Sequence, residues 1–285
     1  MERELWSVLY RLTRQLSSDR SGHAYPVSWI VGVYLWAVVH DRPVSWACRP
    51  ENWPSSWRVR LPSQSTASRR LRTAAAVELI EQLRNRCCHG PHPPDVSFID
   101  GKPLPVGGFT KDPEATRGHG VGGPARGYKL HAVWTIDALV ACEVQPLNVS
   151  EQTVARRLLP QVGGGCVLAD ANYDSNPLHE VAPRAGVTLI VPQRRAGRAL
   201  GHRRHSAGRL RSIELLTTDV GQELYKQRTY IEQRFAQLTN FGGGLGPLPN
   251  WVRRLKRVAL WVNAKLCIHA ARNHLRRGND LMVIA

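Results

Sequence analysis

Two aspartates follow short apolar runs near the middle of the chain. Asp100 follows residues 96–99, and Asp170 follows residues 166–169. Both runs predict buried strands, and open α/β sheets gather their ligands at the carboxyl ends of strands. A single aspartate in such a place is more often a turn or a helix cap. Two of them, aimed by rigid backbone, are the oxygen donors that divalent cations prefer, and a third acid would complete a metal site.

Glu232 is the candidate for that third acid. It lies in a stretch predicted to be one continuous helix, on which Tyr225, Arg228 and Glu232 fall within roughly 60° of each other. A separate apolar stripe, which could pack on a sheet, consists of Leu224, Ile231, Phe235 and Leu238. An ordinary amphipathic helix with an Arg–Glu pair one turn apart has the same spacing. The functional interpretation of this helix therefore depends on the two aspartates.

These three blocks together resemble those of the insertion-sequence DDE transposases. The last block of that family has the signature Tyr, two residues, Arg, three residues, Glu, six residues, Lys. The stretch YKQRTYIEQRFAQLT matches it at Tyr225, Arg228 and Glu232, but Thr239 stands at the Lys position, which contacts DNA in the family. The stretches SFIDGKPLPV and VLADANYDSN resemble the two Asp blocks, and the resemblance covers about residues 95–275.

The resemblance implies an α/β fold of the RNase H-like type, a mixed sheet flanked by helices. It implies that Asp100, Asp170 and Glu232 are the catalytic, metal-binding residues and hold two Mg²⁺ or Mn²⁺ ions, which would relieve the repulsion between the carboxylates. The expected reaction is cleavage at the ends of a mobile element and joining of the 3′-OH ends to target DNA. The alternatives are an RNase H-like structure-selective nuclease and a catalytically inactive, domesticated DNA-binding protein.

The charge of the chain favours a polyanionic partner. Lys and Arg number 39 against 22 Asp and Glu, a net charge of +17, and basic side chains bind DNA by releasing counterions from its phosphates. The expected partners are the terminal inverted repeats of the element and the target DNA, bound by a homodimer in a synaptic complex. Tyr225 and Arg228 are expected to position the scissile phosphate. The other expected DNA contacts are Arg69, Arg70, Lys129, Arg194, Arg195, Arg198, Arg203 and Arg204.

Two domains are predicted. Residues 1–90 form a helical domain for DNA-end binding or dimerisation, and residues 91–285 form the catalytic domain, with a flexible basic loop at 194–211 and a C-terminal helix at 250–277. Strands are predicted at 96–99, 128–136, 139–144, 166–169 and 187–191. Helices are predicted at 5–16, 27–39, 63–86, 151–159 and 176–185. Glycines between 107 and 123 predict a flexible loop, and Asp174 is expected to cap the helix that begins near Asn176.

Two weaker signals leave alternatives open. The start of the helix at 63–86 exposes Arg69 and Arg70, as a helix-turn-helix does toward a major groove, but a solvated basic face has the same pattern. The run CCHGPHPP at 87–94 has poor spacing for a tetrahedral zinc site and favours a proline-rich linker between the domains.

Cysteine usage and hydropathy favour a cytoplasmic protein, and the resemblance to insertion-sequence transposases implies a bacterial protein associated with the nucleoid. The six cysteines form no regular framework, and no signal peptide precedes them. The longest apolar run, at 29–39, is about half of a membrane span, so no membrane partner is expected.

Overall fold

The computed structural model describes residues 1–18, 22, 24–57, 60–88, 90, 94–194, 200, 204–240 and 244–276. The chain divides into two compact units. The first comprises Met1–Cys88, Asn240–Gly246 and Lys256–Ala285, and the second comprises His89–Thr239 and Pro247–Leu255. The C-terminal helix therefore groups with the N-terminal helices, whereas the sequence predicts it in the catalytic domain.

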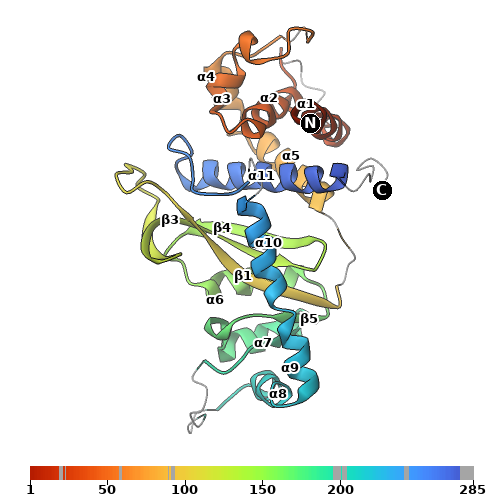
Figure 1. Ribbon diagram of the computed structural model, residues 1–285, viewed down its shortest axis with the longest axis vertical. Helices are drawn as coiled ribbons and strands as arrows, with labels where there is room; N and C mark the ends of the chain where they lie inside the picture. Colours follow the sequence, from red (N-terminus) through yellow and green to blue (C-terminus); the bar gives the residue numbers. More distant parts are fainter. Residues whose placement is uncertain are drawn as a thin grey trace. The chain divides into compact units, whose positions relative to one another are not determined.

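The first unit is helical (Figure 1). Its helices are α1 (Glu2–Leu16), α2 (Val27–Val39), α3 (Val44–Ala47), η1 (Pro50–Asn52), α4 (Gln64–Arg70), α5 (Ala74–Cys88) and α11 (Leu255–Arg276). The helix predicted at 27–39 is confirmed, and it is buried almost throughout because it carries no charged residue. The helix predicted at 63–86 is two helices, since α4 ends at Arg70 and the hydroxyl of Thr73 donates to the Arg70 carbonyl at 2.7 Å.

Polar contacts inside the first unit explain why α11 belongs to it. The guanidinium of Arg84 on α5 donates to Asn263 at 3.0 Å, and the ammonium of Lys265 pairs with Asp41. The middle of α11 is buried on nearly every side, including Trp261, Val262 and Leu266. The sequence pattern indicated one inward face, and a helix with one apolar face can pack equally well on a sheet or on other helices.

The second unit is built on a six-stranded mixed sheet. Its strands are β1 (Val96–Pro105), β2 (Thr116–Gly120), β3 (Gly123–Trp134), β4 (Leu139–Pro146), β5 (Cys166–Leu168) and β6 (Thr188–Ile190). β3 pairs antiparallel with β1, β2 and β4, whereas β5 pairs parallel with both β1 and β6. This sheet and its flanking helices confirm the RNase H-like α/β fold expected from the sequence.

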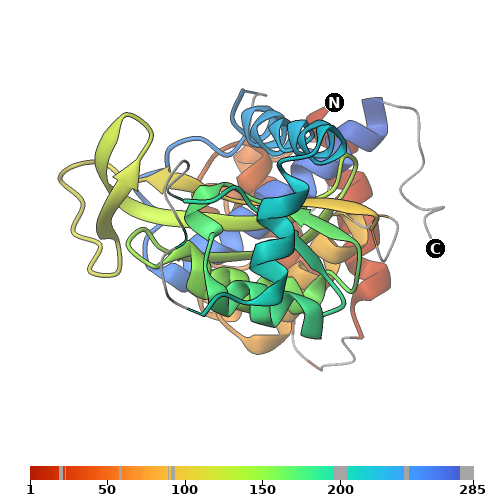
Figure 2. The same cartoon turned by 90° about the horizontal axis from the view of Figure 1, so that it is seen from below.

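Helices cover both faces of this sheet (Figures 1 and 2). They are α6 (Glu151–Leu158), α7 (Asn176–Arg184), α8 (Ala207–Leu215), α9 (Asp219–Lys226) and α10 (Thr229–Asn240), with short turns η2 (Leu159–Gln161) and η3 (Ala171–Tyr173). Ile99 packs in one core with Val154 of α6 and Leu178 of α7. The neighbouring Phe98 points to the other face, where its ring lies 5.9 Å from that of Tyr230 on α10.

Three predictions about the second unit are wrong. The glycine-rich loop at 107–123 contains β2, which forms a hairpin with β3 through the two-residue turn Val121–Gly122, with Gly122 at φ +85°. The basic loop at 194–211 ends in the first turns of α8, which Ser206 caps by accepting from the Arg209 N–H at 3.3 Å. The stretch carrying Tyr225 and Glu232 is two helices.

Among the described residues, no helix is long and apolar enough to cross a membrane.

Candidate active site

Asp100 and Asp170 occupy equivalent register positions, Asp100 within β1 and Asp170 two residues beyond the end of the parallel strand β5. The register pairs Phe98 of β1 with Leu168 of β5, so each aspartate lies two residues beyond a paired residue. Asp170 itself is still extended, with φ −78° and ψ 173°. Because side chains alternate along extended backbone, both carboxylates project to the same face, at the place where β5 has ended.

The sequence predicts Asp100 at the end of a strand, but in the structure it lies inside β1. β1 continues to Pro105 because residues 98–105 pair with β3. The apolar run ends at Ile99, but the hydrogen bonds to β3 do not depend on apolar side chains, so hydropathy alone could not place the end of the strand. Beyond Leu168, β5 no longer pairs with β1, so no residue of β5 is paired with Asp100 on that edge.

The carboxyl group of Asp100 lies in an unfavourable environment for negative charge. Its pKa is raised to about 6, mainly by burial and also by the charges of Asp170 and Glu151, while the Gly101 N–H and the Arg228 guanidinium act in the opposite direction. The Gly101 N–H donates to Oδ1 at 2.7 Å. A buried carboxyl group beside two other carboxylates is a group whose charged form a bound cation would stabilise.

The third acid lies beside a break between helices. α9 ends at Lys226, and α10 begins at Thr229, whose hydroxyl donates to the Lys226 carbonyl at 3.0 Å. Arg228 lies in the junction, so the continuous helix predicted over this stretch, and with it the angular argument for one shared face, is wrong. A hydroxyl that competes for a backbone carbonyl favours such a break, and the apolar spacing gave no sign of it.

The junction nevertheless brings the three signature residues to the aspartates. The Tyr225 hydroxyl donates to the carbonyl of Ala169, the residue before Asp170, at 3.1 Å. The Arg228 guanidinium donates to Glu232 Oε1 at 2.8 Å, and its Nη1 lies 3.9 Å from Asp100 Oδ2. Burial raises the pKa of Tyr225, as do the charges of Asp170, Asp100 and Glu232, whereas Arg228 lowers it. Tyrosine, arginine and the three acids therefore share one electrostatic environment.

Among the described residues, no three acidic, histidine or cysteine side chains lie close enough together to hold a metal ion. The side chain of Glu232 is 61% exposed and is engaged by Arg228. The donor chemistry still fits a hard divalent cation, since Asp100 in β1 and Asp170 just beyond β5 both supply carboxylates. In addition, burial and the neighbouring acids destabilise the charged form of Asp100, which a cation would stabilise. Asp100 and Asp170 would hold the cation, and Glu232 would join them after releasing Arg228.

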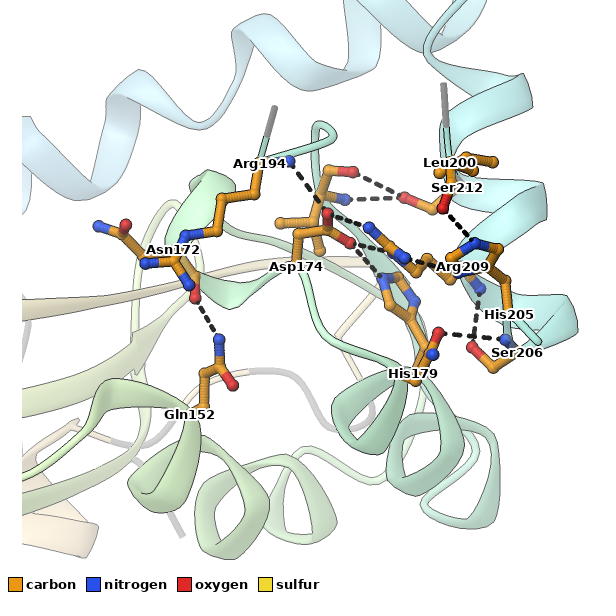
Figure 3. Close-up of polar contacts among 12 residues, drawn as sticks. Gln152, Asn172, Asp174, His179, Arg194, Leu200, His205, Ser206, Arg209 and Ser212 are labelled. Carbon is orange, nitrogen blue, oxygen red and sulfur yellow. Dashed lines mark hydrogen bonds and ion pairs between the residues drawn. The ribbon is translucent and has the colours of Figure 1, made fainter. Parts of the chain in front are cut away.

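Asp174 forms a buried network instead of capping a helix (Figure 3). The N-cap of α7 is Ser175, and the carboxylate of Asp174 accepts from Arg209 Nε at 2.6 Å and Nη2 at 2.7 Å. Nη1 of Arg209 lies 2.7 Å from Nδ1 of His205. The pKa of Asp174 is lowered by Arg209 and by the N–H of Arg194, which together outweigh its burial. This network fastens the segment that carries Asp170 to α8.

Two of the predicted DNA-binding arginines are held near this network through their backbone. The Arg194 N–H donates to Asp174 at 3.0 Å, and the Arg204 carbonyl accepts from the side-chain amide of Asn176 at 3.1 Å. The side chains of Arg194 and Arg204 are both exposed. Residues Arg195, Arg198 and Arg203 lie outside the described residues. In the first unit, Arg69 is exposed and Arg70 is partly buried.

Lys129 is held inside the second unit. The residue is buried, and its ammonium donates to Glu151 Oε1 at 2.7 Å. Glu151 cannot be recognised as a site residue from the sequence, because an acid in the first turn of a helix is common for electrostatic reasons alone. No sequence pattern marks Tyr173 either, which lies between Asp170 and Asp174 and is almost completely buried.

Comparison with known proteins assigns a family to this region of the chain. A family model described as "Transposase DDE domain" matches residues 91–261, which is more than half of the chain. No curated protein and no solved structure matches. The matched region contains both aspartates, the junction between α9 and α10, and Glu232. The chain therefore belongs to the transposase DDE domain family.

Proposed function

We propose that this protein is an active DNA transposase that cleaves at the ends of a mobile element and joins the resulting 3′-OH ends to target DNA. The observation that carries the proposal is the register of β1 and β5, which gives Asp100 and Asp170 equivalent positions beside the Arg228–Glu232 pair. Membership of the transposase family and the net charge of +17 support a DNA substrate.

In this proposal Asp100, Asp170 and Glu232 hold two divalent cations, Mg²⁺ or Mn²⁺. Such cations, when bound, activate the attacking oxygen and stabilise the leaving oxygen of an in-line displacement. The residues of the chain supply the positioning. Tyr225 fixes the start of the Asp170 segment through the Ala169 carbonyl. Arg228 neutralises Asp100 and Glu232 in the free protein and binds the scissile phosphate in the complex.

The remaining DNA contacts are assigned by exposure and charge. Arg194 and Arg204 are exposed beside the Asp170 segment and bind phosphates of the element end. Arg195, Arg198 and Arg203 extend this basic stretch. In the helical unit, Arg69 and Arg70 contact the terminal inverted repeats, and two copies of the chain act together on the paired ends. Lys129 pairs with Glu151 and does not contact DNA in this proposal, because its ammonium is buried against that carboxylate.

The test uses a plasmid that carries the inverted repeats flanking the gene, incubated with protein and Mg²⁺. We expect nicking at the repeat ends by the native protein, and no nicking by Asp100→Asn, Asp170→Asn or Glu232→Gln, with DNA-end binding retained in all three. Asp219→Asn is the matched control, since Asp219 is an exposed acid in the first turn of α9. Binding without nicking by the native protein would support an inactive DNA-binding protein, and nicking of unrelated structured DNA would support a nuclease.

A further inference from the structure

Glu151 is a fourth acid beside Asp100. It is the first residue of α6, and a Cβ atom placed on Gly101 would lie 3.0 Å from its Oε1 atom. Gly101 directly follows Asp100 in β1, so the carboxylate of Glu151 lies against the backbone that carries the first catalytic aspartate. The charge of Glu151 also acts on Asp100 and raises its pKa.

The position of Glu151 is fixed from two directions. Lys129 on β3 donates to its carboxylate at 2.7 Å, and only 18% of the Glu151 side chain is exposed. The next residue, Gln152, donates to the carbonyl of Asn172 in the Asp170 segment at 2.7 Å (Figure 3). The first turn of α6 is therefore tied both to the sheet and to the segment that carries the second catalytic aspartate.

A buried phenol, that of Tyr173, lies three residues after Asp170 in the same segment. Tyr173 is 1% exposed, and its hydroxyl has no hydrogen-bond partner among the described residues. Burial raises its pKa well above the usual value, and the charges of Glu151, Asp100 and Asp170 contribute to this increase. A buried hydroxyl without a partner costs free energy, which a bound ligand or water molecule can recover.

We propose that Glu151 and Tyr173 belong to the divalent-cation site, Glu151 as a fourth acidic residue and Tyr173 as a hydroxyl donor to the oxygen atoms bound there. This inference rests on the proposed function. It assigns both residues a positioning role: the carboxylate adds negative charge and accepts hydrogen bonds from bound water, and the phenol donates one. The surrounding acids favour hydrated cations over a phosphate at this place, because a phosphate would be repelled.

If Glu151 has a purely structural role, its substitution should have different effects. A substitution of its partner Lys129 distinguishes the structural role from a role in the cation site. If the ion pair only supports the fold, Glu151→Gln and Lys129→Met both destabilise the protein and leave cation affinity unchanged. If Glu151 belongs to the cation site, the two substitutions act in opposite directions. Glu151→Gln removes an attractive charge, whereas Lys129→Met removes a repulsive one and frees the carboxylate.

The experiment measures Mn²⁺ binding to the full-length protein without DNA by isothermal titration calorimetry, with Tm measured in parallel. We expect Glu151→Gln to weaken Mn²⁺ binding roughly 10–100-fold, as is usual for partners of metal ligands. Tyr173→Phe, which removes only the hydroxyl, should weaken it about tenfold. Lys129→Met should bind Mn²⁺ more tightly than the native protein despite a lower Tm.

Glu143→Gln is the matched control, because Glu143 on β4 pairs with Arg157 of the same helix α6 at 2.7 Å. It should lower Tm without changing Mn²⁺ affinity. Unchanged affinity in Glu151→Gln, with Asp170→Asn still losing binding, would overturn this inference and leave the proposed function standing. Mn²⁺ binding that Asp170→Asn does not weaken would instead contradict the proposed function itself.

Discussion

The ammonium group of Lys102 donates a hydrogen bond to the hydroxyl of Thr239 at 2.6 Å. Lys102 belongs to the strand that carries Asp100, and Thr239 lies in the last turn of α10. Thr239 is also the position at which the resemblance to insertion-sequence transposases predicts a lysine. A lysine ammonium is therefore present at this place, but it comes from β1 instead of α10.

This contact predicts that Lys102 binds DNA in place of the missing lysine. Lys102→Ala should weaken binding to the element end and lower the slope of log K against log salt by about 0.9, the value for one phosphate contact. The double variant Lys102→Ala/Thr239→Lys should restore both. Lys226→Ala removes another lysine, whose exposed side chain pairs with Glu223 on α9, and serves as the control. An unchanged salt slope in Lys102→Ala would show that this ammonium does not touch DNA.

The hydroxyl of Tyr225 is predicted to set the rate of cleavage. Tyr225→Phe removes its hydrogen bond to the Ala169 carbonyl, which is worth about 1 kcal/mol, and so loosens α9 against the Asp170 segment. We expect a reduction of roughly fivefold in the nicking rate with unchanged affinity for the element end. A loss of affinity without a change in rate would assign the hydroxyl to DNA binding. Tyr230→Phe, which alters a tyrosine on α10 instead, should leave the rate unchanged.

The Asp174–Arg209 pair is predicted to stabilise the second unit. The Asp174 side chain is 1% exposed, and Asp174→Asn would leave the partly buried guanidinium of Arg209 without its charged partner. Breaking a buried pair in this way typically costs about 3–5 kcal/mol in the free energy of unfolding. Urea denaturation at neutral pH measures this loss. A change below 1 kcal/mol would mean that the pair adds little to stability.

The same pair predicts a dependence of stability on pH. The pKa of Asp174 is lowered in the folded protein by Arg209 and the Arg194 N–H, against the effect of burial. Its contribution is therefore fully present above the pKa of an unfolded aspartate and is lost as pH falls through the lower folded value. The difference in unfolding free energy between native protein and Asp174→Asn should shrink as pH falls below about 4. A difference that stays constant there would exclude this linkage.

Gly165 is predicted to be required for the entry into β5. It has φ +72°, and a Cβ atom there would overlap the carbonyl oxygen of Pro94. Gly122 has a similar φ of +85° with open space around it. Gly122→Ala should cost about 1 kcal/mol of unfolding free energy from backbone strain alone, and Gly165→Ala on the order of 3 kcal/mol because steric overlap is added. Equal losses in the two variants would mean that the Pro94 contact relaxes freely.

The features that depend on local pattern were predictable. The helix at 27–39 has a run of apolar residues between two prolines, and the structure forms α2 over those residues. The strand settings of Asp100 and Asp170 follow from their apolar runs. The register that makes the two aspartates equivalent arises from pairing between distant segments, which the sequence pattern does not specify.

The features that depend on single polar contacts were not predictable. The break between α9 and α10 coincides with the hydrogen bond from the Thr229 hydroxyl to the Lys226 carbonyl, and the role of Asp174 depends on Arg209, which is 35 residues away. In the sequence, Glu151 looks like any acid in the first turn of a helix, so only the fold reveals that it lies beside Gly101. Long-range pairing of charged groups leaves no periodic signal in a single sequence.

Strand transfer by a pre-cleaved element end tests whether Asp170 belongs to the catalytic site of a transposase. A labelled duplex with a free 3′-OH is incubated with a target plasmid, Mg²⁺ and either native protein or Asp170→Asn. We expect the native protein to join the labelled end to the plasmid, and Asp170→Asn to bind the duplex without joining it. Joining that persists undiminished in Asp170→Asn, or a native protein that binds the end and never joins it, would rule out the proposed function.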